Sequence, residues 1–313
     1  MLFISVVAKL KVNTTNYTMD PFAPKTVALA LFAATMLALR ALRRRSLTKA
    51  GAFTGFVVGF LLVSTGLRGL VLFYFYQIGS MATHYKECVK SKLDATVVSE
   101  RGATQVLAVS IVAVVLSLAH ARYCGAEQAI DFTAAPEASR LAMAILAHHA
   151  VSLGDTLASE LGMLGTVTRS QHSQQPILVT QPWRRVPVGT NGGISALGTV
   201  WSFVGGLIIG AVTVAMDYFS GISPLNFGRV TLFGGLTGFL GSLLDSILGA
   251  TLQTTYYDDE TKLVYHEHHT NRPKSAQRIC GVSVLTNEQV NFVSVAITSV
   301  IGGWIIAPWF FGL

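Results

Sequence analysis

The chain has 313 residues, of which 51% are hydrophobic and 12% are charged, and its mean hydropathy is +0.52. Soluble domains carry about a quarter charged residues, so this composition excludes a soluble enzyme, a coiled coil and a disordered scaffold. The net charge is +7. Cys88, Cys124 and Cys280 lie far apart without a CxxC pair, which predicts neither a disulfide framework nor a zinc site. The class that remains is a polytopic membrane protein.

Long apolar runs predict the membrane spans, because a bilayer core of about 30 Å needs about 20 helical residues. The eight runs are Thr26–Leu42, Ala50–Ser64, Leu67–Thr83, Ala103–Ala121, Leu141–Leu153, Ser195–Phe219, Val230–Leu252 and Val290–Phe311. The second and third runs predict a tight helical hairpin. The fifth is short and contains His148 and His149, so it could instead be re-entrant, which would leave seven spans.

The positions of Lys and Arg decide between these alternatives, because both residues collect on the cytoplasmic side. With eight spans, 16 of the 23 basic residues fall on one side. The other side then holds seven, Lys9, Lys11, Lys25, Arg68, Arg122, Arg140 and Arg229. With seven spans the counts are 10 and 13, which is no bias. We therefore predict eight spans with both termini on the non-cytoplasmic side.

The predicted fold class is an all-α, polytopic integral membrane bundle of about eight helices. A non-cytoplasmic segment over residues 1–25 precedes one transmembrane domain over residues 26–312, with cytoplasmic loops over 84–102, 154–194 and 253–289. Asn13 and Asn16 begin glycosylation sequons on the predicted lumenal segment. These sequons and the lack of an evident transit peptide favour the endoplasmic reticulum over a plastid. Glycines at four-residue spacing, such as Gly206 with Gly210 and Gly234 with Gly238, predict close helix packing.

The segment Gly154–Gly162 places polar residues where the fifth span meets the cytoplasmic face. Asp155 and Ser159 are four residues apart and share a helix face. Glu160 lies roughly 140° away from Asp155 on a helix and would need a broken helix to join it. Ionisable groups at membrane depth usually mark a pathway or a site, although a solvated helix end is the alternative.

The segment Val188–Ser195 leads into the sixth span and contains Asn191, Gly192 and Gly193. Backbone amides of such a loop can converge on an anion, and the following helix directs its positive end at the same place. Arg184 and Arg185 lie just upstream. This pattern predicts a phosphate-binding loop, and the alternative is a helix cap with turn glycines.

The segment Gly241–Gln253 ends the seventh span. A small, polar stripe follows one face of this helix, because Gly238, Ser242, Asp245 and Gly249 are spaced by four, three and four residues. A lone carboxylate in an apolar helix needs a cation, a metal ion or a basic partner. We therefore assign Asp245 to a functional site.

The predicted topology places these three segments at one membrane face. Carboxylates from Asp155 and Asp245 suit Mg²⁺, which prefers one or two carboxylates together with phosphate oxygens. Phosphoryl transfer chiefly needs positioning and neutralised charge. His266, His268 and His269 are weaker candidates for binding a metal, because they lie in a polar segment and a solvated loop explains their presence. Asn287 and Asn291 begin the last span, where they cap it, form hydrogen bonds across helices or face the site.

These segments resemble the transmembrane protein 19 family, whose plant branch contains phytyl-phosphate kinases. The resemblance covers about residues 25–312 and is carried by Gly154–Gly162, Thr190–Gly198, Gly241–Gln253 and Asn287–Ser294, with weaker matches at Leu47–Val63 and Arg101–Ala108. It implies transfer of a phosphoryl group from a nucleoside triphosphate to a prenyl monophosphate.

The first hypothesis is therefore a Mg²⁺-dependent kinase that uses ATP or CTP and acts on an isoprenoid or related lipid phosphate in the bilayer. Asp155, Glu160 and Asp245 are its predicted catalytic residues, with Mg²⁺ on Asp155 and Asp245. Asn191, Gly192, Gly193, Arg184, Arg185 and Ser242 are its predicted phosphate- or nucleotide-binding residues. The alternatives are a membrane transporter and a non-catalytic membrane organiser. A homo-oligomer is compatible with all three, and no nucleic-acid partner is expected.

Overall fold

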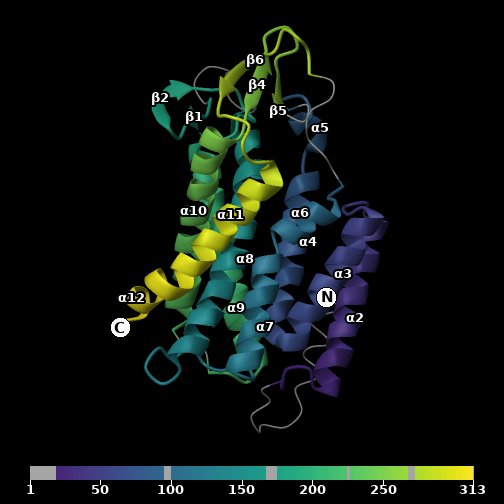
Figure 1. The fold of residues 1–313 in the computed structure, drawn as a ribbon, viewed down its shortest axis with the longest axis vertical. Helices are drawn as coiled ribbons and strands as arrows, with labels where there is room; N and C mark the ends of the chain where they lie inside the picture. The colour runs from purple at the N-terminus through teal and green to yellow at the C-terminus, as the bar shows by residue number, and fades with distance from the viewer. Residues whose placement is uncertain (1–18, 95–99, 167–174, 224–225, 267–271, 313) are drawn as a thin grey trace.

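The apolar runs form helical segments that alternate in direction along the long axis of a bundle in the computed structural model (Figure 1). The structure describes residues 19–94, 100–166, 175–223, 226–266 and 272–312. The first half of the chain contains α2 (Pro24–Arg43), α3 (Lys49–Thr65), the 3-10 turn η1 (Leu67–Leu70), α4 (Val71–His84), α5 (Glu87–Lys90), α6 (Ala103–Ala108), α7 (Ile111–Tyr123) and α8 (Pro136–Gly162).

The second half begins with the 3-10 turn η2 (Met163–Thr166) and a small sheet of β1 (Ile177–Leu178), β2 (Gln181–Arg185) and β3 (Gly193–Ile194). It continues with α9 (Ala196–Phe219), α10 (Phe227–Leu252), β4 (Thr255–Asp258), β5 (Leu263–His266), β6 (Gln277–Cys280) and α11 (Asn287–Ile301). A π-helical turn over Gly302–Ile306 leads into α12 (Ala307–Phe311). We call the end of the bundle that carries β1–β6 the strand end.

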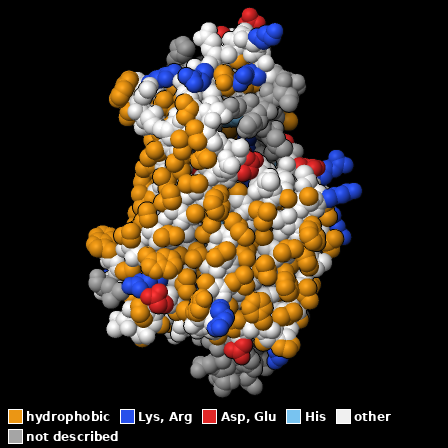
Figure 2. Space-filling view, viewed as in Figure 1, with side chains coloured by type: hydrophobic (Ala, Val, Ile, Leu, Met, Phe, Trp, Pro, Cys, Tyr) orange, Lys and Arg blue, Asp and Glu red, His pale blue; other side chains and the backbone are white. Residues whose placement is uncertain are grey.

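The predicted integral membrane helical bundle is confirmed. Five helices are long and apolar enough to cross a membrane, namely α2, α8, α9, α10 and the continuous segment Asn287–Phe311, while α3 and α7 are shorter apolar helices. Hydrophobic side chains cover the middle of the face in Figure 2, and charged ones gather towards its two ends. Large apolar side chains stand exposed around the bundle, among them Phe53, Val115, Val200, Ile305 and Trp309. A lipid environment explains this exposure.

The helix that contains the fifth apolar run is longer than the run itself. The predicted Leu141–Leu153 is the middle of α8, which has 27 residues and begins at Pro136. Charged residues in its outer turns, namely Glu137, Arg140, Asp155 and Glu160, lower the hydropathy without breaking the helix. Helix α8 is therefore long enough to span, as the eight-span prediction requires. It is also central, because 78% of its most apolar window is buried against only 33–44% in the other four candidates.

The fourth run is interrupted, because α6 ends at Ala108 and α7 begins at Ile111. The break leaves the Val109 carbonyl without a helical partner, and His148 Nε2 donates to it over 2.9 Å. This hydrogen bond accounts for one of the two adjacent histidines of α8. Both ring nitrogens of buried His149 lack a hydrogen-bond partner among the described residues.

Glycines bring α8, α9 and α10 into backbone contact, as their spacing predicted for α9 and α10. A Cβ atom on Gly206 would lie 2.0 Å from the Gly234 carbonyl oxygen. A Cβ atom on Gly154 of α8 would lie 2.6 Å from the Ser202 carbonyl oxygen. Gly59 of α3 differs, because a Cβ there would meet Ala34 at an ordinary 3.6 Å.

Two small antiparallel sheets form at the strand end, in the orders β2-β1-β3 and β5-β4-β6. The sequence predicts only loops here, because strands of two to five residues carry too little periodicity. The β4–β5 turn is closed by Asp258, which accepts from the amide and hydroxyl of Thr261 over 2.8 and 2.7 Å. The two sheets therefore fold the long loops back over the helix ends.

A buried charge cluster closes the opposite end of the bundle. Arg68 donates from Nε and Nη2 to the two carboxylate oxygens of Asp217 over 2.6 and 3.1 Å. Glu127, in the α7–α8 connection, accepts from the Arg68 amide over 2.9 Å. Burial raises the pKa of Glu127 to about 7, against an opposing effect of the Arg68 charge. With one cation between two carboxyl groups, protonation of Glu127 makes the cluster neutral.

Substitution Gly206→Ala is expected to destabilise the bundle, because its methyl group would overlap the Gly234 carbonyl. Overpacking of this kind costs about 1–3 kcal/mol. Thermal unfolding of the purified variant in detergent measures the loss. Gly59→Ala is the matched control and should unfold close to the wild-type temperature. Equal effects of the two variants would contradict this packing.

The stability contributed by Glu127 should fall as pH rises. Its pKa is raised from 4.5 to about 7 on folding, so between these pH values the folded state binds more protons than the unfolded state. The free energy of unfolding therefore decreases with pH through this window and levels off above it. Thermal unfolding from pH 5 to 8 should show a shallower dependence in Glu127→Gln than in the wild type; parallel curves would contradict the assignment.

Candidate functional site

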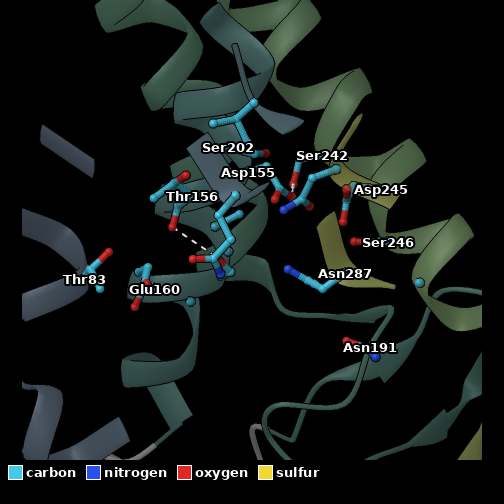
Figure 3. A pocket seen from close by; sticks show the side chains of 18 of the residues that line it. Thr83, Asp155, Thr156, Glu160, Asn191, Ser202, Ser242, Asp245, Ser246 and Asn287 are labelled. Atoms are coloured by element: carbon cyan, nitrogen blue, oxygen red, sulfur yellow. Dashed lines mark hydrogen bonds between the residues drawn. The ribbon is translucent and has the colours of Figure 1, made fainter. Parts of the chain in front are cut away.

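A cavity of about 930 Å³ lies at the strand end of the bundle, between α3, α4 and α6 on one side and α8, α9, α10 and α11 on the other. Figure 3 labels lining side chains from α4, α8, α9, α10, α11 and the loop that contains Asn191. The three polar segments that the sequence predicts at one membrane face all reach this cavity. Asp155, Asn191, Gly192, Gly193, Ser242 and Asp245 all line it.

Asp155 and Asp245 form the centre of the polar wall. Asp155, on α8, accepts from Ser242 Oγ of α10 over 3.0 Å. Asp245 lies one turn further along α10 and accepts from Ser294 Oγ of α11 over 2.8 Å. The two carboxylates lie close enough to repel each other. The predicted stripe on α10 is confirmed for Ser242, Asp245 and Gly249, while Gly238 packs against α9.

Two amide side chains at the start of α11 extend this wall. Thr286 caps the helix, because its Oγ1 accepts from the Gln289 amide over 3.3 Å and its own amide donates to Gln289 Oε1 over 2.9 Å. The cap fixes the first turn, and Asn287 and Asn291 line the cavity one turn apart. Amide side chains here can donate to phosphate oxygens or accept from a hydrated cation.

Glu160 does not join the aspartate pair, as its angular position on an unbroken helix requires, and its catalytic role stays a prediction. Helix α8 continues unbroken to Gly162, which turns Glu160 towards α4 and the α4–α6 connection. There its Oε2 accepts from Lys90 Nζ over 2.6 Å. Lys90 is fully buried and also donates to the Ala82 and Thr83 carbonyls at the end of α4. Glu160 therefore belongs to an ion pair that joins α8 to α5.

Two backbone amides of the predicted phosphate loop already have partners within the protein. The amides of Asn191 and Gly193 donate to Thr255 Oγ1 over 3.2 Å and to the Thr190 carbonyl over 2.9 Å. Gly192 has a positive φ of 74° and fits against α10, where a Cβ would lie 2.4 Å from Ala250. The proposed nest of converging amides is therefore wrong for Asn191 and Gly193, and the loop acts as a wall of the cavity.

The Asn191 side chain contributes to a polar chain that sequence analysis missed. Asn191 Nδ2 lies 3.1 Å from His266 Nδ1, and His266 Nε2 lies 3.3 Å from Asp94 Oδ2. His266 was interpreted as part of a solvated loop, but strand β5 places it at the cavity. The strand pairing that does this was not evident from the sequence. His268 and His269 lie outside the described residues.

The two predicted phosphate-binding arginines lie elsewhere. Arg184 and Arg185 belong to β2, where Arg184 Nη1 donates to Gln181 Oε1 over 3.4 Å and Arg185 Nη1 to the Gln175 carbonyl over 3.5 Å. Neither lines the cavity. The basic residue that does so is Arg101, before α6. Burial lowers the pKa of Arg101, and the nearby Glu160 charge opposes this effect.

The charges around the cavity are unbalanced. Its described lining contains five carboxylates, namely Asp94, Asp155, Glu160, Asp245 and Glu288. Glu160 pairs with Lys90, and Asp94 with His266. Among the described residues, neither Asp155 nor Asp245 pairs with Lys, Arg or His. Two neighbouring carboxylates with serine partners alone favour binding of a cation.

The comparisons with known proteins support the membrane assignment. Residues 32–299 match the family model described as integral membrane protein DUF92. The chain belongs to the DUF92 family. The DUF92 match includes Arg101, Asp155, Asp245 and both asparagines of α11. The narrower resemblance to the transmembrane protein 19 family stays a prediction.

Two relatives of this DUF92 protein cover most of its length. Protein PGR of Arabidopsis thaliana is 30% identical over 279 residues, which are 86% of this chain and 92% of the relative. An uncharacterized membrane protein of Synechocystis sp. is 30% identical over 229 residues, which are 71% of this chain and 78% of the relative. No solved structure matches the chain significantly. The sequons at Asn13 and Asn16 lie outside the described residues, so glycosylation there stays a prediction.

Proposed function

We propose that this DUF92 protein is a Mg²⁺-dependent kinase that transfers a phosphoryl group from ATP or CTP to a prenyl-type lipid monophosphate. The observation that carries the proposal is the pair of Asp155 and Asp245, which has no basic partner among the described residues and lines a cavity with both polar and apolar walls. A cation on this pair would attract the phosphate groups of a substrate.

The oxygen donors of the pair fit Mg²⁺. Carboxylates from Asp155 and Asp245 are the expected ligands. Ser242 and Ser294 orient them, because each hydroxyl donates a hydrogen bond to one oxygen of its aspartate. The described residues contain no cluster of three or more His, Cys, Asp or Glu side chains that could enclose a metal. Mg²⁺ does not need one, because it usually binds one or two carboxylates together with waters and phosphate oxygens.

The apolar wall fits the tail of a lipid substrate. Leu37, Val58, Leu72, Phe75 and Val109 contribute to it from α2, α3, α4 and the break after α6. These side chains adjoin the polar wall within one cavity, so one ligand with a charged head and a hydrocarbon tail can contact both. Isoprenoid monophosphates have this composition.

The reaction needs positioning more than proton transfer. A phosphate oxygen of the prenyl monophosphate attacks the γ-phosphorus, the bond from that phosphorus to the bridging oxygen breaks, and a nucleoside diphosphate leaves. The attacking oxygen is already anionic, so no general base is required. Bound Mg²⁺ would neutralise charge on the transferred group. Asn287 and Asn291 are placed to orient phosphate oxygens by donating hydrogen bonds.

The position of the cavity favours a kinase over a transporter. Transporter sites usually lie near the middle of the membrane, whereas this cavity includes residues of the strand end such as Asn191 and His266. Nucleotide from the aqueous phase and phosphate head groups from the bilayer can meet at such a position. We assign the reaction to the cytoplasmic face of an endomembrane, in agreement with the distribution of Lys and Arg.

Substitution Asp245→Asn is expected to abolish the response to Mg²⁺ while keeping the fold. Ser294 can still donate to the asparagine carbonyl, and repulsion from Asp155 disappears, so the variant should be at least as thermostable as the wild type without Mg²⁺. Mg²⁺ should stabilise the wild type and leave the variant unchanged. Formation of prenyl diphosphate, measured by mass spectrometry, should fall by about 100-fold or more.

Asp259→Asn is the matched control for this experiment, because Asp259 is exposed and pairs with Lys262 in the β4–β5 turn. It should keep both the Mg²⁺ response and the activity. Full activity of Asp245→Asn would remove the metal assignment. Wild-type protein in liposomes tests the alternative. Solute flux without formation of a diphosphate from any prenyl monophosphate would overturn the kinase and support a transporter.

Substitution Gly55→Leu is expected to shorten the accepted tail. Gly55 lines the apolar wall, and its nearest side-chain atoms lie 3.5 Å or more from the position of a Cβ. The added side chain should therefore occupy tail space. The ratio of kcat/KM for a long against a short prenyl monophosphate should fall in Gly55→Leu and stay near the wild-type value in Gly55→Ala. An unchanged ratio in Gly55→Leu would place the tail elsewhere.

A further inference from the structure

Arg101 differs from every other described residue around the cavity, because it is the one Lys or Arg in the described lining. Its contacts are with the start of α3 and the end of α4. In the sequence it only begins a weaker stretch of the family resemblance, Arg101–Ala108, and no role follows from that. Its position next to an excess of carboxylates is a tertiary feature.

The backbone of Arg101 is held firmly. Its amide donates to the Ser46 carbonyl over 3.0 Å, and its carbonyl accepts from the Thr48 amide over 3.1 Å. The carbonyl also lies close to α3, where a Cβ on Gly51 would be 2.5 Å away. On the side chain, Nη2 donates to Thr83 Oγ1 over 2.8 Å. Thr83 is the one described side chain that accepts from the guanidinium, which has five N–H donors in all.

Two carboxylates lie in or near the connection that carries Arg101, and both already have partners. Asp94 pairs with His266. Glu160 is the carboxylate whose charge acts on Arg101, but it already accepts from the buried ammonium of Lys90 over 2.6 Å. Lys90, Glu160 and Arg101 together carry one net positive charge. Asp155, on the next turn of α8 from Glu160, begins the wall where carboxylates are in excess. The cavity therefore has a cationic side and an anionic side.

We propose that Arg101 binds a phosphate group of the substrate while the aspartate pair faces the cation that accompanies it. A magnesium-chelated polyphosphate or a metal-bound phosphate ester presents both charges that these walls complement. A guanidinium suits this role, because it donates two parallel hydrogen bonds to phosphate oxygens. Arg101 thus takes the role that the sequence suggested for Arg184 and Arg185. This inference rests on the proposed function for the identity of the phosphates, which belong to the nucleotide or to the prenyl head group.

Binding of magnesium pyrophosphate, used as a probe, tests the subsite without catalysis. Titration calorimetry on detergent-purified protein should show Arg101→Gln binding the probe at least about tenfold more weakly than the wild type, as expected for loss of charge-assisted hydrogen bonds. Arg184→Gln and Arg185→Gln are matched controls and should bind within about twofold of the wild type. Thr83→Val keeps the charge but loses the hydrogen bond that positions it, and should give an intermediate affinity.

Steady-state kinetics then identify the bound group. A rise in KM for the nucleotide alone assigns Arg101 to the donor, and a rise for the prenyl monophosphate alone assigns it to the acceptor. Wild-type affinity for pyrophosphate in a folded Arg101→Gln variant would overturn the subsite, as would loss of affinity in Arg184→Gln or Arg185→Gln. Arginine-dependent binding of pyrophosphate without phosphoryl transfer to any prenyl monophosphate would support the subsite and overturn the kinase.

Discussion

The backbone contact of α8, α9 and α10 through glycine determines where the two aspartates meet. Gly154 immediately precedes Asp155, and Gly238 lies on the same face of α10 as Ser242 and Asp245. Because these glycines let the helix axes approach closely, the next polar turn of each helix faces the other. The contact is apolar and tight, whereas the carboxylates beyond it repel each other. Helix packing therefore holds together two groups that would separate if they were free.

The two ends of the bundle handle buried charge in opposite ways. At the end away from the strands, Arg68 is enclosed by Asp217 and Glu127, and its guanidinium also donates to the Gln128 carbonyl over 2.8 Å. That cluster is complete in itself and ties η1 to α9. At the strand end the charges are divided, with the cation of Arg101 on one wall and the carboxylate pair on the other. Such a division stabilises little by itself, but it complements a ligand that carries both signs.

Irregular helix geometry gives the cavity its mixed character. The break between α6 and α7 places Val109 and Ser110 in the lining, and His148 satisfies the carbonyl that the break exposes. Non-helical backbone at membrane depth is tolerated where protein buries it or where it lines a cavity. Here it meets both conditions. The apolar wall beside this break and the polar wall of α8, α10 and α11 together suit an amphiphile better than either would alone.

The sequence by itself determined the membrane class, the positions of the helices and the side of the bundle on which Asp155 and Asp245 meet. These follow from local hydropathy, from helical periodicity and from the alternation of spans, which are properties of neighbouring residues. Only the tertiary structure decided the partner of Glu160, the exclusion of Arg184 and Arg185 and the place of His266 and Arg101. Lys90 and Glu160 are 70 residues apart, so their pairing depends on how the connecting loops fold back, and no local pattern encodes that return.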